Sequence, residues 1–268
     1  MRILVTNDDG IASRGLLELA AALGTAGDVT VVAPATNMTA ASRSITLEEE
    51  VLVDEVDLPD GSVGFAVAGT PTDCVRFAML GLAGEPPDLV VSGINQGANL
   101  GDDVGYSGTV AAAVEGLFAG VPAIAVSQRS LPGTREWDVD GRTFDYRAVA
   151  GFTAQLVGHI SRHGLPKGTL LNVNAPGLPP DQLNGVRATR LGRRIYRTTL
   201  ELVSRESGRR QYRLWDDDPS YHHEDGTDFT AIADGCISVT PLHYDLTAHA
   251  AIETLTGWDL ASMLAGPA

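Results

Sequence analysis

Two adjacent acids near the start of the chain have the residue types and spacing that point most directly to chemistry. Asp8 and Asp9 stand in the segment Thr6-Asn7-Asp8-Asp9-Gly10, which follows the apolar run Ile3-Leu4-Val5. Neighbouring carboxylates repel each other and raise each other's proton affinity unless a cation lies between them. We therefore expect a divalent metal ion at Asp8 and Asp9. The alternative is an ordinary turn in which one aspartate caps the following helix and the other faces water.

A second polar segment, Ser92–Asp103, carries Asn95 and Asn99 among several glycines. It follows the apolar residues Leu89–Val91, which predict a buried strand. Because the carboxyl ends of parallel strands meet at one edge of a sheet, we expect this segment to lie beside the acid pair. The Asn95 amide oxygen is a suitable further ligand for a hard cation. An ordinary turn rich in glycine and asparagine is the alternative.

A third segment, Ser107-Gly108-Thr109, precedes a run of small residues that predicts a helix over Val110–Ala119. The first N–H groups of a helix are unpaired and carry partial positive charge, so they suit an anion. We expect Ser107, Gly108 and Thr109, with Asn99, to bind a phosphate group. Capping of the helix by Ser107 is compatible with this role.

Two further clusters are interpreted as exposed loops. Asp102-Asp103 suggests a second metal, but a solvated turn is the simpler interpretation for adjacent aspartates. His222-His223-Glu224-Asp225 has metal-ligand residue types without a recognisable zinc spacing. Cys74 and Cys236 lie far apart in the sequence and form no disulfide framework.

Several enzyme signatures are missing from the sequence. There is no Gly-x-Gly-x-x-Gly after the first strand, no phosphate-binding Gly-x-x-x-x-Gly-Lys-Ser/Thr, and no Gly-x-Ser-x-Gly elbow. Paired acids after a first strand also occur in receiver-type phosphoacceptor domains, although such a domain has about half this length. A receiver-like aspartyl phosphoacceptor and a non-catalytic module that binds metal or phosphate therefore remain as alternatives to an enzyme.

The acidic composition limits the classes of molecule that the protein is expected to bind. The 268 residues carry a net charge of −15, which argues against binding to a nucleic-acid duplex or an anionic membrane. The same charge would repel a phosphate substrate unless a cation is bound nearby. No apolar run approaches the ~20 residues of a membrane span, and the N-terminus shows no signal-peptide pattern. We expect a cytoplasmic protein.

The predicted elements indicate a single α/β domain. A strand at Ile3–Thr6, a helix at Arg14–Leu23 and a strand at Val29–Ala33 suggest a right-handed parallel crossover. Later segments alternate in type and end in a predicted helix over Leu246–Leu264. Between them, Ile195–Val203 and Gln211–Trp215 predict a long hairpin.

This hairpin lies in a basic part of the chain. Residues 187–213 hold nine of the nineteen Lys and Arg residues. The segment provides few aromatic residues for stacking on nucleic acid. An exposed hairpin of this length needs covering, so we expect it to mediate oligomerisation.

Taken together, the motifs resemble the survival protein SurE family. The resemblance rests on Asn7-Asp8-Asp9-Gly10, on Ser92-Gly93-Ile94-Asn95 with Gly97 and Asn99, and on Tyr106–Ala111. Thr227-Asp228 and Ser238–Leu242 match the family's late signature. The resemblance covers nearly the whole chain. One departure is Arg14, which stands where the family has a proline and affects only the local loop.

The resemblance implies a metal-dependent hydrolase of nucleoside 5′- and 3′-monophosphates, which in some members also acts on short polyphosphate. It implies one Mg²⁺ or Mn²⁺ per subunit, held by Asp8, Asp9, Asn95 and Thr39, with Ser42 as the substitute for Thr39 if the loop register differs. Asp8, Asp9 and Asn95 are also the catalytic candidates.

The resemblance further implies a Rossmann-like three-layer α/β/α core with a mostly parallel sheet. We expect this core over residues 1–180 and 234–245, a hairpin arm over 186–230 and a C-terminal helix over 246–264. The arm and the C-terminal segment would form a homodimer or homotetramer.

Overall fold

The computed structural model describes residues 1–131, 144–196, 198–216, 220–258 and 260–265. The strands are β1 (Arg2–Thr6), β2 (Asp28–Pro34), β3 (Val53–Asp57), β4 (Val63–Val67), β5 (Leu89–Gln96), β6 (Ala123–Gln128), β7 (Thr169–Ala175), β8 (Val186–Ala188), β9 (Arg194–Ile195), β10 (Thr198–Glu206), β11 (Arg209–Asp216), β12 (Ser220–Tyr221) and β13 (Ile237–His243). The α-helices are α1 (Arg14–Leu23), α2 (Pro71–Met79), α3 (Gly108–Phe118), α4 (Arg147–His163), α5 (Asp228–Ala233) and α6 (His249–Thr256). Short 3₁₀ turns cover Gly101–Gly105, Pro180–Gln182 and Ser262–Ala265.

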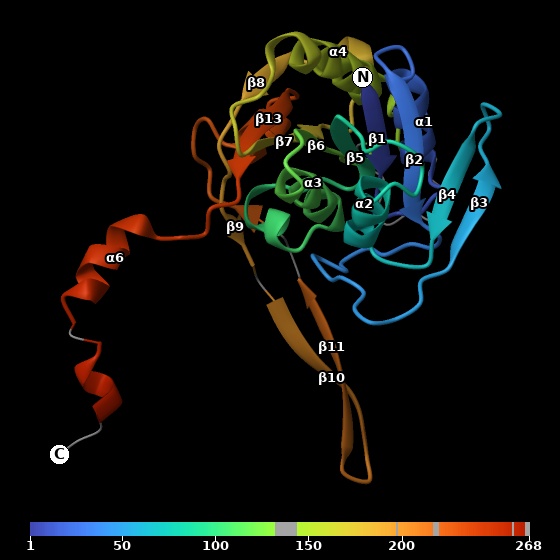
Figure 1. The fold of residues 1–268 in the computed structure, drawn as a ribbon. Coiled ribbons are helices and arrows are strands. Elements are labelled where there is room, and N and C mark those ends of the chain that lie inside the picture. Colours follow the sequence, from blue (N-terminus) through green and yellow to red (C-terminus); the bar gives the residue numbers. More distant parts are fainter. Residues whose placement is uncertain (132–143, 197, 217–219, 259, 266–268) are drawn as a thin grey trace.

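The central sheet has the strand order β3-β4-β2-β1-β5-β6-β7-β13-β8. The pairs from β4 through β2, β1, β5 and β6 to β7 are parallel, and so is β13 with β8. The pairs β3–β4 and β7–β13 are antiparallel. Figure 1 shows β1 and β5 near the middle of this sheet, which places their carboxyl ends side by side. The predicted α/β fold with a mostly parallel sheet is confirmed.

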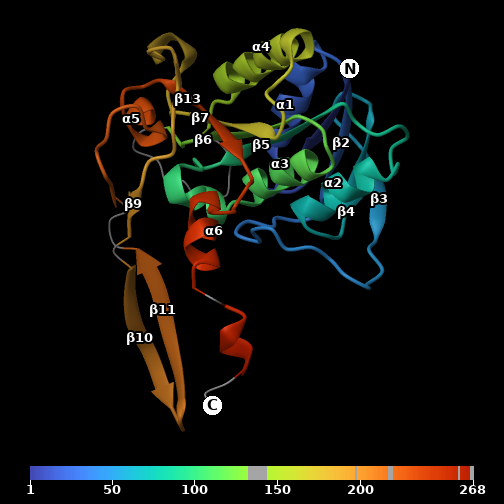
Figure 2. The same ribbon diagram turned by 60° about the vertical axis from the view of Figure 1, so that its left-hand side comes forward.

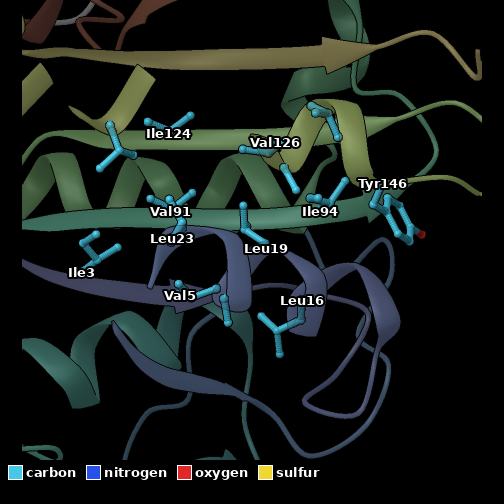
Figure 3. Packing of buried hydrophobic residues seen from close by; sticks show 14 of the residues in the cluster. Ile3, Val5, Leu16, Leu19, Leu23, Val91, Ile94, Ile124, Val126 and Tyr146 are labelled. Carbon is cyan, nitrogen blue, oxygen red and sulfur yellow. The ribbon is translucent and has the colours of Figure 1, made fainter. Parts of the chain in front are cut away.

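Alternating side chains of the strands fill two apolar layers. Ile3 and Val5 of β1 belong to the cluster under α1 and α4, whereas Leu4 between them belongs to the cluster under α2 and α3. This alternation is the two-residue period of a strand that is covered on both faces. Figure 3 shows Leu16, Leu19 and Leu23 of α1 packed over Ile3, Val5 and Val91.

Helix starts follow local chemistry. Thr70 caps α2, and its hydroxyl and Asp73 form a reciprocal capping box, as the sequence Thr-Pro-Thr-Asp predicts. Ser13 caps α1 by accepting a hydrogen bond from the Leu16 backbone N–H. Neither Asp8 nor Asp9 caps α1. The alternative in which one of these aspartates caps the following helix is therefore wrong.

Two segments project from the core. Strands β10 and β11 form a separate two-stranded hairpin below the sheet, and the chain after β13 leads away to α6 (Figures 1 and 2). The hairpin arm is narrower than the predicted 186–230, because β8 pairs with β13 in the main sheet and α5 packs against β13. Within the described residues, no helix is long and apolar enough to cross a membrane.

The predicted C-terminal helix over Leu246–Leu264 is wrong in its extent. The helix α6 begins at His249 and ends at Thr256, where Gly257 caps it, and a short 3₁₀ turn follows. Residue 259 of the predicted span lies outside the described residues. Glycine has low helix propensity, so the apolar periodicity of this segment continues past the point where the backbone stops being helical.

Candidate active site

Asp8 lies at the carboxyl end of β1 and is 3% exposed. Its Oδ1 accepts a 2.6 Å hydrogen bond from the hydroxyl of Thr109, at the start of α3. The neighbouring Gly108 comes so close that a Cβ there would lie 2.8 Å from Asp8 Oδ2. The start of α3 therefore fixes the Asp8 carboxylate from one side and leaves no room for a side chain at position 108.

Asp9 is partly exposed and turns toward β5. Its Oδ2 accepts a 3.1 Å hydrogen bond from the backbone N–H of Gln96. The preceding Asn7 shapes the loop, because its amide nitrogen donates to the Gly10 carbonyl and to the Ser13 hydroxyl. The two acids are thus held by backbone and side-chain donors from both neighbouring elements.

Burial raises the pKa of the Asp8 carboxyl, against the opposing effect of the Thr109 hydrogen bond. The pKa of Asp9 is raised to about 7, first by burial and then by the charge of Asp8, with the Gln96 N–H acting in the opposite direction. Both shifts have the same cause. Burial is the leading cause for each acid, and the charge of Asp8 adds to the effect at Asp9.

The loop after β2 brings Thr39 to the acids. The Met38 backbone N–H donates a 2.7 Å hydrogen bond to the Asp8 carbonyl, and the Thr39 N–H donates to Asn37 Oδ1. Thr39 is exposed and lines the cavity above Asp8. The hydroxyl of Ser42, the substitute ligand in the prediction, donates instead to the Gly105 carbonyl at 3.2 Å. Thr39, and not Ser42, is among the residues that line the cavity, and its role as a metal ligand stays a prediction.

A cation–π contact holds the far side of the same loop. The Arg43 guanidinium lies 4.1 Å from the centre of the Tyr244 ring and 5.3 Å from that of Phe118. Thr46 adds hydrogen bonds from its backbone N–H and its hydroxyl to the carboxylate of Asp73. The loop that carries Thr39 is anchored to α2, to α3 and to the chain after β13.

Asn95 lies within strand β5 and not in the loop that the sequence suggests. The register between β5 and β6 shifts between Ser92 and Asn95. Gly93 makes this possible, because its φ is +141° and a Cβ there would lie 2.2 Å from the Val126 carbonyl oxygen. The Asn95 Nδ2 donates to the Gly97 carbonyl at 2.8 Å, so its orientation is fixed and its amide oxygen can serve as a metal ligand.

The predicted phosphate ligands fall into two groups. Ser107 lines the cavity and its Oγ accepts from the Val110 N–H, which caps α3. Thr109 is 0% exposed and its hydroxyl is committed to Asp8. The Asn99 side chain donates to the Ser127 hydroxyl at 2.8 Å. The hydroxyl of Thr109 thus helps to position Asp8, and the phosphate roles of Asn99, Ser107, Gly108 and Thr109 stay predictions.

One cavity of about 530 Å³ joins these segments. Asp8, Thr39, Asn95 and Ser107 line it on one side. Tyr106, Arg194 and Tyr196 also line it, and the sequence analysis did not single them out as site residues. Tyr106 stands within a quoted motif, whereas Arg194 and Tyr196 come from the base of the hairpin, about ninety residues further along the chain, and no local pattern marks them.

The two clusters interpreted as exposed loops have structural partners. Asp103 forms an ion pair with Arg194, and Asp102 Oδ2 accepts from the Arg194 backbone N–H at 2.9 Å. Glu224 pairs with Arg190 and Arg193. These contacts account for Asp102, Asp103 and Glu224 without a second metal.

The donor set of the cavity fits a hard divalent cation. In the described ranges, no group of three or more His, Cys, Asp or Glu side chains could hold a metal ion. The candidate ligands are instead two carboxylates, an amide oxygen and a hydroxyl, all of them oxygen donors, which suits Mg²⁺ or Mn²⁺ and not zinc. The raised pKa values of Asp8 and Asp9 indicate a site that a bound cation would stabilise.

Comparison with known proteins adds an independent observation. The family model described as "Survival protein SurE" matches residues 3–198. The chain belongs to the SurE family. A 5′-nucleotidase SurE of Rubrobacter xylanophilus is 49% identical over 98% of this chain and 99% of its own length, and one of Chloroflexus aggregans is 47% identical over 97% and 99%. The crystal structure of the SurE protein from Aquifex aeolicus has a TM-score of 0.79 and 35% identity, covering 95% of this chain and 98% of that one.

Membership of the SurE family implies a divalent metal cofactor in general terms. The matched residues 3–198 include every predicted ligand of the cation and every predicted phosphate ligand. The family assignment therefore agrees with the oxygen-donor set that the cavity presents.

Proposed function

We propose that this protein is a 5′/3′-nucleotidase that hydrolyses the phosphomonoester of nucleoside monophosphates with one bound Mg²⁺ or Mn²⁺. The observation that carries the proposal is the adjacent pair of buried Asp8 and partly exposed Asp9, with Asp8 lining a cavity large enough for a small ligand. The SurE relatives named 5′-nucleotidase support the activity. Asp8, Asp9, Asn95 and Thr39 would hold the cation.

The bound cation would supply charge neutralisation at the phosphate and a bound water as nucleophile. The residues of the chain do the remaining work. Asp8 is held by Thr109 and Asp9 by the Gln96 N–H, so neither acid has to reorganise when the phosphate arrives. The N-terminal end of α3, next to Ser107, would bind phosphoryl oxygens. Asp8 or Asp9, beside the reacting phosphate, would accept a proton from the attacking water.

The test is phosphate release from AMP with Mn²⁺ or Mg²⁺, with and without a chelator. Asp8→Asn and Asn95→Ala should each lose at least about a hundredfold in turnover while the far-ultraviolet circular dichroism stays that of the wild type. Asp60→Asn, at an exposed turn, is the matched control and should keep full activity. A panel that adds 3′-AMP, other bases and short polyphosphate defines the substrate range.

The alternatives give different results in the same experiment. A non-catalytic module would release no phosphate with any metal. A receiver-like domain would form a stable aspartyl phosphate on treatment with acetyl phosphate, which mass spectrometry detects. Near-wild-type turnover by folded Asp8→Asn would contradict the proposed function.

We further propose that the protein assembles as a homodimer or homotetramer through the hairpin arm and the C-terminal segment. Both segments expose large apolar side chains, with Leu200 and Leu214 64% and 70% exposed on the arm and Ile252 51% exposed on α6. An isolated two-stranded hairpin is marginally stable in water, so contacts with another chain would stabilise it. Replacing residues 198–216 by a short glycine turn should lower the mass measured by light scattering, and an unchanged mass would contradict the assembly proposal.

A further inference from the structure

The cavity has two ends of different chemistry. Asp8, Thr39, Asn95 and Ser107 form the polar end described above. The other end is lined by Tyr106 and Tyr196, which are 68% and 48% exposed. Large aromatic rings that border a polar cavity and remain exposed are available to a ligand. The proposed function does not use this aromatic end.

Both rings belong to segments that are held in place. Tyr106 directly follows the 3₁₀ turn at Gly101–Gly105, and its N–H donates to the Asp103 carbonyl at 2.9 Å. The Tyr196 hydroxyl donates a 3.0 Å hydrogen bond to Asp103 Oδ1. Asp103 thus fixes both tyrosines, one through its backbone and the other through its side chain.

Arg194 is held by the same carboxylate. Its guanidinium pairs with Asp103 and lies 5.2 Å from the centre of the Phe229 ring. The pairing neutralises the one cationic side chain that lines the cavity in the described residues. The aromatic end is therefore suited to a flat group without net charge, while the phosphate binds at the polar end.

We propose that Tyr106 and Tyr196 form a nucleobase-binding rim that gives this site its preference for nucleotides over smaller phosphomonoesters. This inference rests on the proposed nucleotidase function and names the part of the substrate that the rim recognises. Base–aromatic stacking is sequence-tolerant because every base has a π face. The rim therefore predicts activity on several nucleoside monophosphates, without strong discrimination among bases.

The test compares AMP with ribose 5-phosphate, which keeps the phosphoester and the sugar but has no base. The ratio of kcat/KM for AMP to that for ribose 5-phosphate should fall about tenfold in Tyr106→Ala and in Tyr196→Ala, and further in the double variant. Tyr196→Phe keeps the ring and loses only the hydrogen bond to Asp103, so its ratio should fall less than that of Tyr196→Ala. Tyr212→Ala, an exposed tyrosine of the hairpin outside the cavity, is the matched control.

Adenosine binding to the wild type and the variants, followed by calorimetry, separates the two proposals. The rim predicts adenosine binding that weakens about tenfold in each alanine variant, whether or not phosphate is released. If AMP is not hydrolysed but adenosine binds through both tyrosines, the nucleotidase function fails and the rim stands. An unchanged substrate ratio together with unchanged adenosine binding in the double variant would overturn the rim, and the two rings would then be contacts for a second copy of the chain.

Discussion

The two ends of the cavity are built in different ways. The acid end lies where β1 and β5 finish, and Asp8 there is 3% exposed and held by Thr109. The aromatic end lies at the base of the hairpin arm, where Tyr106 is 68% exposed. Catalysis needs donors that are held in place before the substrate arrives, whereas stacking tolerates some freedom in an exposed ring. In the proposed function, the sheet core would supply the chemistry and the peripheral segments would supply recognition.

Among variants that distinguish the acid end from the aromatic end, we expect the largest loss of activity for a change at Thr109. Thr109→Val removes the hydroxyl that donates to Asp8 and keeps the shape of the side chain. Loss of such a supporting hydrogen bond typically costs about 10- to 100-fold in metal affinity or activity. We expect a loss of that size in Mn²⁺-dependent phosphate release from both AMP and ribose 5-phosphate.

Two variants sharpen this prediction. Thr109→Ser retains a hydroxyl and should recover most of the activity. Thr153→Val is the matched control, because Thr153 is also 0% exposed and its hydroxyl donates to a carbonyl within α4, away from the cavity. If Thr109→Val lowered phosphate release from AMP and not from ribose 5-phosphate, the assignment of catalysis to the acid end and of base recognition to the aromatic end would be wrong.

A smaller effect is expected at Gly108. A Cβ at this position would lie 2.8 Å from both Cβ and Oδ2 of Asp8, so Gly108→Ala should displace the carboxylate and weaken Mn²⁺ binding about tenfold. Gly151→Ala makes the same substitution in α4, where nothing lies within 4 Å of the new Cβ. This control should raise the free energy of unfolding by about 0.5–1 kcal/mol and leave turnover unchanged. Equal Mn²⁺ affinity of the two variants in a titration would contradict the predicted contact.

The smallest effect is on the pH dependence of stability. Burial and the charge of Asp8 raise the pKa of Asp9 from 3.8 to about 7, so the folded protein binds more protons than the unfolded chain between these values. The contribution of Asp9 is fully present below pH 3.8 and is lost as the pH rises through about 7. The metal-free protein should therefore lose a few degrees of Tm over this interval, relative to Asp9→Asn.

Added Mn²⁺ should remove most of this loss, because the cation replaces the proton between the two carboxylates. A change at the aromatic end should not alter this pH dependence. Tyr106→Ala should therefore show the same slope of Tm with pH as the wild type. Identical slopes for the wild type and Asp9→Asn would contradict the account of the acid pair.

Much of the acid end could be predicted from the sequence. Asp8 and Asn95 each follow an apolar run within a few residues, which identifies two strand ends at one sheet edge, and a parallel sheet brings those ends together. The sequence did not reveal that Asn95 lies within β5, because the register shift at Gly93 depends on its packing against Val126. Nor could it show that the Thr109 hydroxyl points to Asp8 and not to a substrate.

The aromatic end could not be predicted in the same way. Tyr196 reaches the cavity because Asp103, ninety-three residues earlier in the chain, accepts its hydroxyl hydrogen bond. Such a contact depends on how the hairpin base packs against the 3₁₀ turn at Gly101–Gly105, and neither segment has a periodic pattern that specifies it. The end of α6 at Gly257 was missed for a related reason, since apolar spacing alone predicts a longer helix.

The most direct test of the central claim is a calorimetric titration of Mn²⁺ into the metal-free protein above neutral pH. We expect about one Mn²⁺ site per chain in the wild type and its loss in Asp8→Asn and Asp9→Asn, with both variants still folded. Saturable Mn²⁺ binding of wild-type affinity in the folded Asp8→Asn protein would contradict it.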